Sequence, residues 1–329
     1  MSATEAQKAP AARRDSGFAP VLVDSLRCLV TAPVDIFVRN QTKGAPTLYC
    51  RAGYPLASAK FLGLADAGVE QVYIRADDYH CFGTELLQSV QSLLQRDDVP
   101  AIDRFAALQA AVSVEIEHSA RLMDCRRFLS LADKVGRDLV TLLTASEVLP
   151  RDLFGIARHD FRTFTHVTNV ASYGVVLAER MGIKDEGELN QIAIAGMLHD
   201  IGKRFVPASI LNKPAKLDSA ERAIIELHPV RGYEDLQHRH EFTFGQLMIV
   251  YQHHERIDGT GYPVRLTGKE IHPWAKMLAV VDVFDAMTGN RPYRRPAPAK
   301  IALEYIQDNL GTHFDSEAAK CWISAMSET

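Results

Sequence analysis

Hydrophobic and polar residues alternate with different periods in the two halves of the chain, which predicts different elements there. At 34–38 and again at 47–50, β-forming residues alternate with others, which predicts two strands. The turn-forming residues 40–46 between them predict a hairpin. A short helix is predicted over 55–66, ended by Gly68, and another strand over 69–74. Residues 19–97 are therefore expected to form a small α+β module.

From about residue 101 to 147 the apolar residues recur at helical spacing, and Gly136 is the only glycine. Two apolar faces result, made of Phe105, Leu108, Ala111 and Val112, and of Phe128, Leu131, Val135 and Leu139. This spacing predicts a helical connector over 98–149, of a kind that can form a homodimer. From 150 to 329 the pattern indicates successive helices separated by short loops that contain Gly or Pro. The expected fold is mostly α, with an all-helical C-terminal domain and a disordered tail over 1–18.

Composition and charge exclude several classes of protein. The 329 residues are 47% hydrophobic and 24% charged, which is typical of a soluble protein with two domains or one large one. The net charge of −4 argues against a protein that coats DNA, although a small anionic ligand stays compatible with it. No apolar stretch approaches the ~20 residues needed to cross a bilayer. Five scattered cysteines fit reduced thiols, so a cytoplasmic location is expected.

Histidines concentrate in one part of the chain, where eight of the twelve lie between residues 166 and 272. The strongest signal is the adjacent pair His199 and Asp200, which follows an apolar stretch at 192–198. A carboxylate at the end of a helix can bind one metal ion and bridge to a second. Lys203 lies four residues after His199, on the same side of a helix, where its ammonium group would meet a phosphate oxygen.

The second signal is the pair His253 and His254 at the expected end of another helix. Two adjacent imidazoles there can converge on one metal ion. The Gly-Thr-Gly stretch at 259–261 allows the following loop to approach a ligand or a partner closely. Tyr262 is a candidate substrate contact, and with Pro263 it either contacts a partner or only shapes the loop.

Three further positions fit the same site, namely His166, His228 and Asp282. Asp282 and Asp285 lie on an otherwise apolar helix, where a carboxylate is costly to bury unless it is paired or bound to metal. We expect Asp282 to be a ligand and Asp285 to support a ligand or to position the attacking water.

The complete ligand set has five imidazoles and two carboxylates, which is too many for one tetrahedral zinc ion. It suits two divalent ions with mixed nitrogen and oxygen ligands, and Fe or Mn fits such a set. Two such ions can activate a water molecule and stabilise the charge that develops on a phosphate. Glu255 either orients a ligand imidazole or pairs locally, and His272, before Pro273, is expected to cap or pack a helix.

Three segments, HDIGK at 199–203, HHERIDGTGYP at 253–263 and DVFDAMTGNRPYR at 282–294, closely resemble the HD-GYP subgroup of the HD-domain phosphohydrolases. The resemblance covers roughly residues 150–329. It implies a phosphodiesterase that hydrolyses cyclic di-GMP to pGpG and GMP.

The resemblance also implies roles for single residues. The first metal ion would be held by His166, His199, Asp200 and Asp282, and the second by Asp200, His228, His253 and His254. Lys203 would contact the scissile phosphate, and the guanidinium groups of Arg291 and Arg294 would grip the phosphates of the ligand. Arg162 stands where some members have a glutamate that binds a third ion, so two metal ions are expected.

Two alternatives stay open at this point. The first is a signalling adaptor that binds cyclic di-GMP, or a GGDEF-domain partner through the Gly-Tyr-Pro loop, without useful catalysis. The second is an enzyme that acts on another cyclic dinucleotide or on a nucleotide monophosphoester.

Overall fold

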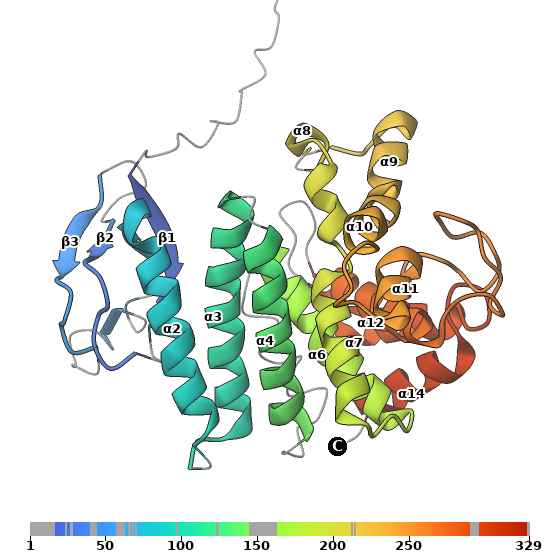
Figure 1. The fold of residues 1–329 in the computed structure, drawn as a ribbon, viewed down its shortest axis with the longest axis horizontal. Helices are drawn as coiled ribbons and strands as arrows, with labels where there is room; N and C mark the ends of the chain where they lie inside the picture. The colour runs from blue at the N-terminus through green and yellow to red at the C-terminus, as the bar shows by residue number, and fades with distance from the viewer. Residues whose placement is uncertain are drawn as a thin grey trace, which may run out of the picture. The chain divides into compact units, whose positions relative to one another are not determined.

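The computed structural model of the chain describes residues 17–327 apart from 24, 27–28, 40–44, 57–62, 65–66, 68, 70, 97, 123–124, 145–162, 212, 214 and 290–295. The chain is mostly helical, as the sequence predicts, and it divides into two compact units between Ser89 and Val90 (Figure 1). In these residues no helix combines the length and the apolar character that a membrane span requires.

The first unit contains an antiparallel sheet of four strands in the residues that the structure describes. In the order in which they lie in the sheet, these are β1 (Phe18–Leu22), β4 (Gln71–Arg75), β2 (Ile36–Val38) and β3 (Thr47–Cys50). The pairing of β2 with β3 confirms the predicted hairpin, and β4 confirms the predicted third strand. The helix predicted over 55–66 lies mostly outside the described residues.

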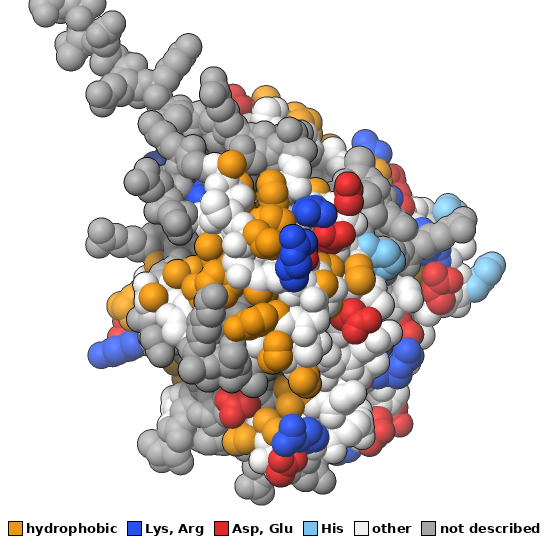
Figure 2. All heavy atoms as spheres, turned by 90° about the vertical axis from the view of Figure 1, so that its left-hand side faces the viewer, with side chains coloured by type: hydrophobic (Ala, Val, Ile, Leu, Met, Phe, Trp, Pro, Cys, Tyr) orange, Lys and Arg blue, Asp and Glu red, His pale blue; other side chains and the backbone are white. Residues whose placement is uncertain are grey.

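Alternation along β4 separates the two faces of this sheet. Val72 and Ile74 are buried, whereas Gln71 and Arg75 on the other face are exposed. Figure 2 looks onto the side where the strands lie and shows apolar side chains gathered there, with charged side chains at their margin. The sheet is followed by a short 3₁₀ helix, η2 (Ala76–Asp78), and by α2 (Tyr79–Leu94).

The predicted connector consists of two helices, α3 (Ala101–Leu122) and α4 (Cys125–Thr144), which pack against each other. The predicted apolar faces are confirmed, because Phe105, Leu108, Leu131 and Leu139 are buried. The side chain of Phe128 lies outside the described residues. Both helices also pack against α6, and α4 packs against α7, so they belong to the second unit.

The helices that follow make up the rest of the second unit. They are α6 (Thr163–Arg180), α7 (Glu186–Leu198), η3 (Ile201–Phe205), α8 (Ala208–Leu211), α9 (Ser219–Glu226), α10 (His228–Leu236), α11 (Phe244–Gln252), α12 (Pro273–Thr288), α13 (Ala299–Asp308) and α14 (Ser316–Ser327). The start of α12 confirms the prediction for His272, whose Nδ1 accepts a hydrogen bond from the backbone N–H of Trp274 at 3.2 Å.

Two glycines allow helices to approach closely where the candidate residues lie. A Cβ atom on Gly196 of α7 would lie 2.8 Å from the Cα of Ala171 on α6. A Cβ atom on Gly202 of η3 would lie 1.9 Å from the backbone oxygen of His228 on α10. Only glycine fits at these contacts. They hold α7 against α6, and η3 against α10.

A cluster of aromatic rings fixes the other side of this core. Tyr173 on α6, Phe284 on α12 and Trp322 on α14 are almost fully buried, and their ring centroids lie 5.3–6.0 Å apart. Such edge-on and tilted contacts are favourable for aromatic rings. The cluster thereby holds α6 and α12 in a fixed relation, and these two helices carry His166, Asp282 and Asp285.

Candidate metal centre

The seven predicted ligands come from helix ends and helix interiors that converge. They are His166 on α6, His199 and Asp200 at the end of α7, His228 at the start of α10, His253 and His254 at the end of α11, and Asp282 on α12. The structure brings all seven together in two groups of ligand atoms, each within 4.8 Å of one another. One group is His166, His199 and Asp282, and the other is Asp200, His228, His253 and His254.

Asp200 faces both groups. Its Oδ2 lies 3.7 Å from Nε2 of His166 and 3.5 Å from Nε2 of His199. Its Oδ1 lies 3.2 Å from Nε2 of His228, and it accepts no hydrogen bond from the described residues although it is buried. A buried carboxylate oxygen without a hydrogen bond is costly unless a cation meets it. The side chain is therefore placed to bridge two cations.

Backbone carbonyl groups determine which nitrogen of three imidazoles faces the centre. Nδ1 of His199 lies 2.7 Å from the oxygen of Gly196, and Nδ1 of His228 lies 2.8 Å from the oxygen of Ile225. Nδ1 of His253 lies 3.0 Å from the oxygen of Val250. A carbonyl oxygen can only accept, so each Nδ1 donates, and in the neutral imidazole Nε2 then carries a lone pair.

These lone pairs point at one another. Nε2 of His228 and Nε2 of His253 are only 3.2 Å apart. Two neutral acceptors at that distance repel, whereas a cation coordinated by both would remove the repulsion. Together with the unsatisfied oxygen of Asp200, this arrangement fits a bound metal ion, and orientation of a ligand imidazole through its other nitrogen is the usual support in such sites.

The two groups differ in electrostatics. Burial disfavours the charged form of His166, but hydrogen bonds to Asp282 and Asp285 outweigh it and raise the pKa of His166 to about 9. In the other group, burial lowers the pKa of His254 to about 3 and lowers that of His253 well below its usual range. The imidazoles of His253 and His254 are therefore neutral at neutral pH, whereas a cation that binds His166 must displace a proton.

Both carboxylates are held as anions. Burial opposes ionisation of Asp200, but Lys203 and His199 outweigh it and hold the pKa of Asp200 well below its usual range. The same balance, with His166 as the main opposing group, lowers the pKa of Asp282. Nζ of Lys203 lies 2.5 Å from Oδ2 of Asp200, so this ammonium group lies beside the centre, where the sequence places it.

The remaining predicted substrate contacts are Tyr262, Arg291 and Arg294. The ring of Tyr262 lies against that of His254, with centroids 4.7 Å apart and planes tilted by 32°. Its backbone N–H donates to the oxygen of His254 at 3.2 Å. Tyr262 therefore borders the second group. Arg291 and Arg294 lie outside the described residues, as does Arg162.

Glu255 belongs to the loop and not to the imidazoles, which decides between the two interpretations of this residue. It is almost fully buried, and its Oε1 accepts from the backbone N–H groups of Val264 at 2.7 Å and Arg265 at 3.1 Å. Its Oε2 accepts from the N–H of Leu266 at 3.0 Å. Gly261 packs on the backbone of the same turn, where a Cβ atom would lie 2.4 Å from the nitrogen of Arg256. Glu255 thus anchors the Gly-Tyr-Pro loop.

Asp285 supports a candidate ligand. Its Oδ2 lies 2.7 Å from Nδ1 of His166, and its Oδ1 accepts from Nδ2 of Asn169 at 2.7 Å. Asn169 in turn accepts from Gln109 of α3. Sequence reasoning missed both amides. A signal existed for Asn169 alone, because it lies three residues after His166 and so shares a face of α6.

Comparison with known proteins identifies the family. Residues 155–318 match the HD domain family. The chain is 32% identical over 293 residues to the cyclic di-GMP phosphodiesterase PA4108 of Pseudomonas aeruginosa, and the match covers 84% of this chain and 70% of that protein. This chain belongs to the HD-GYP family. The resemblance stated from the three motifs is thereby confirmed.

Two further relatives match over less than half of their own length, and one solved structure matches over its whole length. The response regulator RpfG of Xanthomonas campestris pv. campestris, a cyclic di-GMP phosphodiesterase, is 37% identical over 170 residues, which are 51% of this chain and 45% of that one. The 3′3′-cGAMP-specific phosphodiesterase 3 of Vibrio cholerae is 33% identical over 216 residues, 61% of this chain and 46% of that one. Bd1817, an HDG"Y"P protein from Bdellovibrio bacteriovorus, shares the fold with a TM-score of 0.69 at 18% identity, over 94% of this chain and all of that one.

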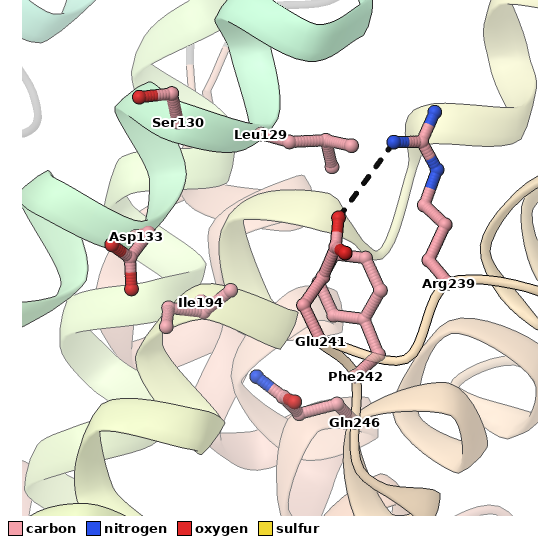
Figure 3. A pocket seen from close by; sticks show the side chains of 8 residues that line it. All are labelled: Leu129, Ser130, Asp133, Ile194, Arg239, Glu241, Phe242 and Gln246. Atoms are coloured by element: carbon pink, nitrogen blue, oxygen red, sulfur yellow. Dashed lines mark ion pairs between the residues drawn. The ribbon is translucent and has the colours of Figure 1, made fainter.

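A separate pocket of the second unit is lined by other residues. It has a volume of about 470 Å³ and lies between α4, α7 and the start of α11 (Figure 3). Its lining is Leu129, Ser130, Asp133, Ile194, Arg239, Glu241, Phe242 and Gln246. None of the seven candidate ligands lines it, and its charged pair, Arg239 and Glu241, is already matched at 3.7 Å. The candidate chemistry therefore belongs to the His/Asp clusters.

Proposed function

We propose that this chain is a metal-dependent phosphodiesterase that hydrolyses cyclic di-GMP to linear pGpG, with GMP as the product of a second cut. The observation that carries the proposal is the position of Asp200, with one carboxylate oxygen toward each of two imidazole-rich groups. Relatives named cyclic di-GMP phosphodiesterases, among them the one matched over most of this chain, support the choice of substrate.

The proposal assigns His166, His199, Asp200 and Asp282 to one ion, and Asp200, His228, His253 and His254 to the other. Nitrogen and oxygen ligands without a thiolate favour Fe or Mn. When bound, the two cations supply an activated water nucleophile and stabilise the charge on the transferred phosphate.

The chain's own residues hold the substrate. Lys203, whose ammonium group lies beside Asp200, is assigned to an oxygen of the phosphodiester. Arg291 and Arg294 are assigned to the phosphates, and Tyr262 to the border of the substrate site. In the reaction the bond from phosphorus to the 3′ oxygen breaks, water adds to phosphorus, and the 3′ oxygen gains a proton. We further propose residues 19–97 as a regulatory module, 98–149 as a connector and 150–329 as the catalytic domain.

A specific observation favours a second substrate. The three 3′3′-cGAMP-specific phosphodiesterases of Vibrio cholerae are 33–40% identical to this chain, as close as the relatives that are named for cyclic di-GMP. Both substrates share the phosphodiester that the centre would act on. A comparison of kcat/KM for the two cyclic dinucleotides decides between them.

Asp200→Ala tests the proposal. Because it removes the bridging group, we expect turnover to fall by about a thousandfold or more and bound metal to drop from two ions to one or none. Circular dichroism checks that the fold is retained, and Asp133→Ala, on the pocket of Figure 3, is the matched control with wild-type turnover expected. Wild-type protein loaded anaerobically with Fe or Mn that hydrolyses neither dinucleotide would refute the proposed function.

A further inference from the structure

A line of buried polar side chains connects helix α3 to a candidate metal ligand. Nε2 of Gln109 on α3 donates to Oδ1 of Asn169 on α6. Nδ2 of Asn169 donates to Oδ1 of Asp285 on α12 at 2.7 Å, and Oδ2 of Asp285 accepts from Nδ1 of His166 at 2.7 Å. All four residues are at most 7% exposed, so water does not compete for these bonds.

The bonds converge on the carboxylate of Asp285, which accepts from Asn169 on one side and from His166 on the other, and this determines how His166 is presented. Because Gln109 donates to the carbonyl oxygen of Asn169, the amide group of Asn169 must turn its NH₂ toward Asp285. Each oxygen of that carboxylate then receives one donor, and one of these donors is Nδ1 of His166. The remaining nitrogen, Nε2, faces Asp282 at 3.2 Å and Asp200 at 3.7 Å.

This support differs from that of the other imidazoles. His199, His228 and His253 are oriented by backbone carbonyls within four residues of themselves, on their own or the preceding helical turn. The line that orients His166 instead runs through side chains of α12, α6 and α3, the last of which lies upstream of the matched HD domain at 155–318.

We infer that Gln109 is a positioning residue of the metal centre: through Asn169 and Asp285 it sets the orientation of the His166 imidazole and thereby the affinity of the first group for its ion. The inference rests on the proposed function for the identity of the site. It links helix α3 to the centre through Asn169 and Asp285, so that a displacement of α3 would be transmitted to His166 in the first group.

The test measures Co²⁺ binding to the first group alone. In a His228→Ala/His253→Ala/His254→Ala background, which removes every imidazole of the second group and leaves His166, His199 and Asp282 intact, Co²⁺ affinity is followed by visible absorption. Gln109→Met keeps the side-chain length and removes the donor. We expect about a 10- to 100-fold weaker Co²⁺ affinity, the range typical when a partner of a ligand is lost.

A second variant and a control make the result decisive. In Gln109→Glu, the ionised carboxylate turns a negatively charged oxygen toward Oδ1 of Asn169 and repels it. The loss of Co²⁺ affinity should therefore be at least as large as in Gln109→Met. The control Gln246→Met changes an equally buried glutamine that bonds Thr243 and Gln191, without a bond to the centre, and first-group affinity should stay within about twofold.

A double-mutant cycle shows whether the effect passes through Asp285. In an Asp285→Asn protein, adding Gln109→Met should weaken Co²⁺ binding no further, because residues in one network are not additive. Wild-type Co²⁺ affinity in both Gln109 variants would overturn the inference, and so would a loss equal to that of Gln246→Met. Co²⁺ binding is independent of substrate, so a failure to hydrolyse cyclic dinucleotides would refute the proposed function without deciding this question.

Discussion

Replacing Glu255 by glutamine should release the Gly-Tyr-Pro loop. The carboxylate accepts three backbone N–H bonds, from Val264, Arg265 and Leu266, at 2.7–3.1 Å. A glutamine has one carbonyl oxygen, so if it keeps the first two bonds, its NH₂ faces the N–H of Leu266. A hydrogen bond to a charged group contributes about 1.5–3 kcal/mol, and losing one while two become neutral amounts to about 3 kcal/mol.

Amide hydrogen exchange measures this loss where it occurs. Because 1.4 kcal/mol is a factor of ten, protection of the amides of Val264, Arg265 and Leu266 should fall by about 100-fold in Glu255→Gln. The control is Glu270→Gln in the same loop, an exposed residue whose carboxylate bonds Thr267, where protection should change by less than about threefold. Equal protection in Glu255→Gln and wild type would refute the assigned role of this carboxylate.

Two further predictions concern packing and protons. Gly202→Ala would place a Cβ atom 1.9 Å from the backbone oxygen of His228. Its free energy of unfolding, measured in urea, should therefore fall by about 3 kcal/mol or more, or no folded protein should be obtained. In the control Gly17→Ala, whose Cβ atom would meet nothing within 4 Å, the free energy of unfolding should change by less than about 0.5 kcal/mol. Because the pKa of His166 is raised to about 9, Co²⁺ must displace a proton there at any lower pH. Affinity of the first group should therefore rise by up to about tenfold per pH unit from 6 to 8 in the protein that lacks the three imidazoles of the second group, and a pH-independent affinity in calorimetric titrations would contradict this.

Local pattern was sufficient for most of the elements. The hairpin of β2 and β3 and the helices α3 and α4 follow from the periods of their apolar residues. The predicted elements do not include β1 or α2. Strand β1 contains Pro20, which argues against a strand, and it is tolerated because β1 lies at the edge of the sheet. That edge position is a property of the sheet and not of the segment.

The candidate ligands were also accessible from the sequence, because they occur as pairs and motifs of metal-binding residue types. Of their supports, the sequence indicated Asp285 as one of two alternatives for that residue, but it indicated neither Gln109 nor Asn169. Gln109 bonds Asn169 across 60 residues, and His166 bonds Asp285 across 119. The sequence around a single amide side chain on an apolar helix does not indicate which distant residue it will bond. The sequence around Glu255 likewise does not indicate that its carboxylate binds the loop backbone.

The sequence by itself determined the helical class, the HD-GYP motifs and the seven side chains that face one another, since residue type and local spacing are enough for these. Only the tertiary structure decided that each oxygen of Asp200 faces a different group, which nitrogen of each imidazole faces inward, and which carboxylates serve as supports. These properties depend on the crossing of α6, α7, α10 and α12, and contacts between distant helices are set by packing that no single segment encodes.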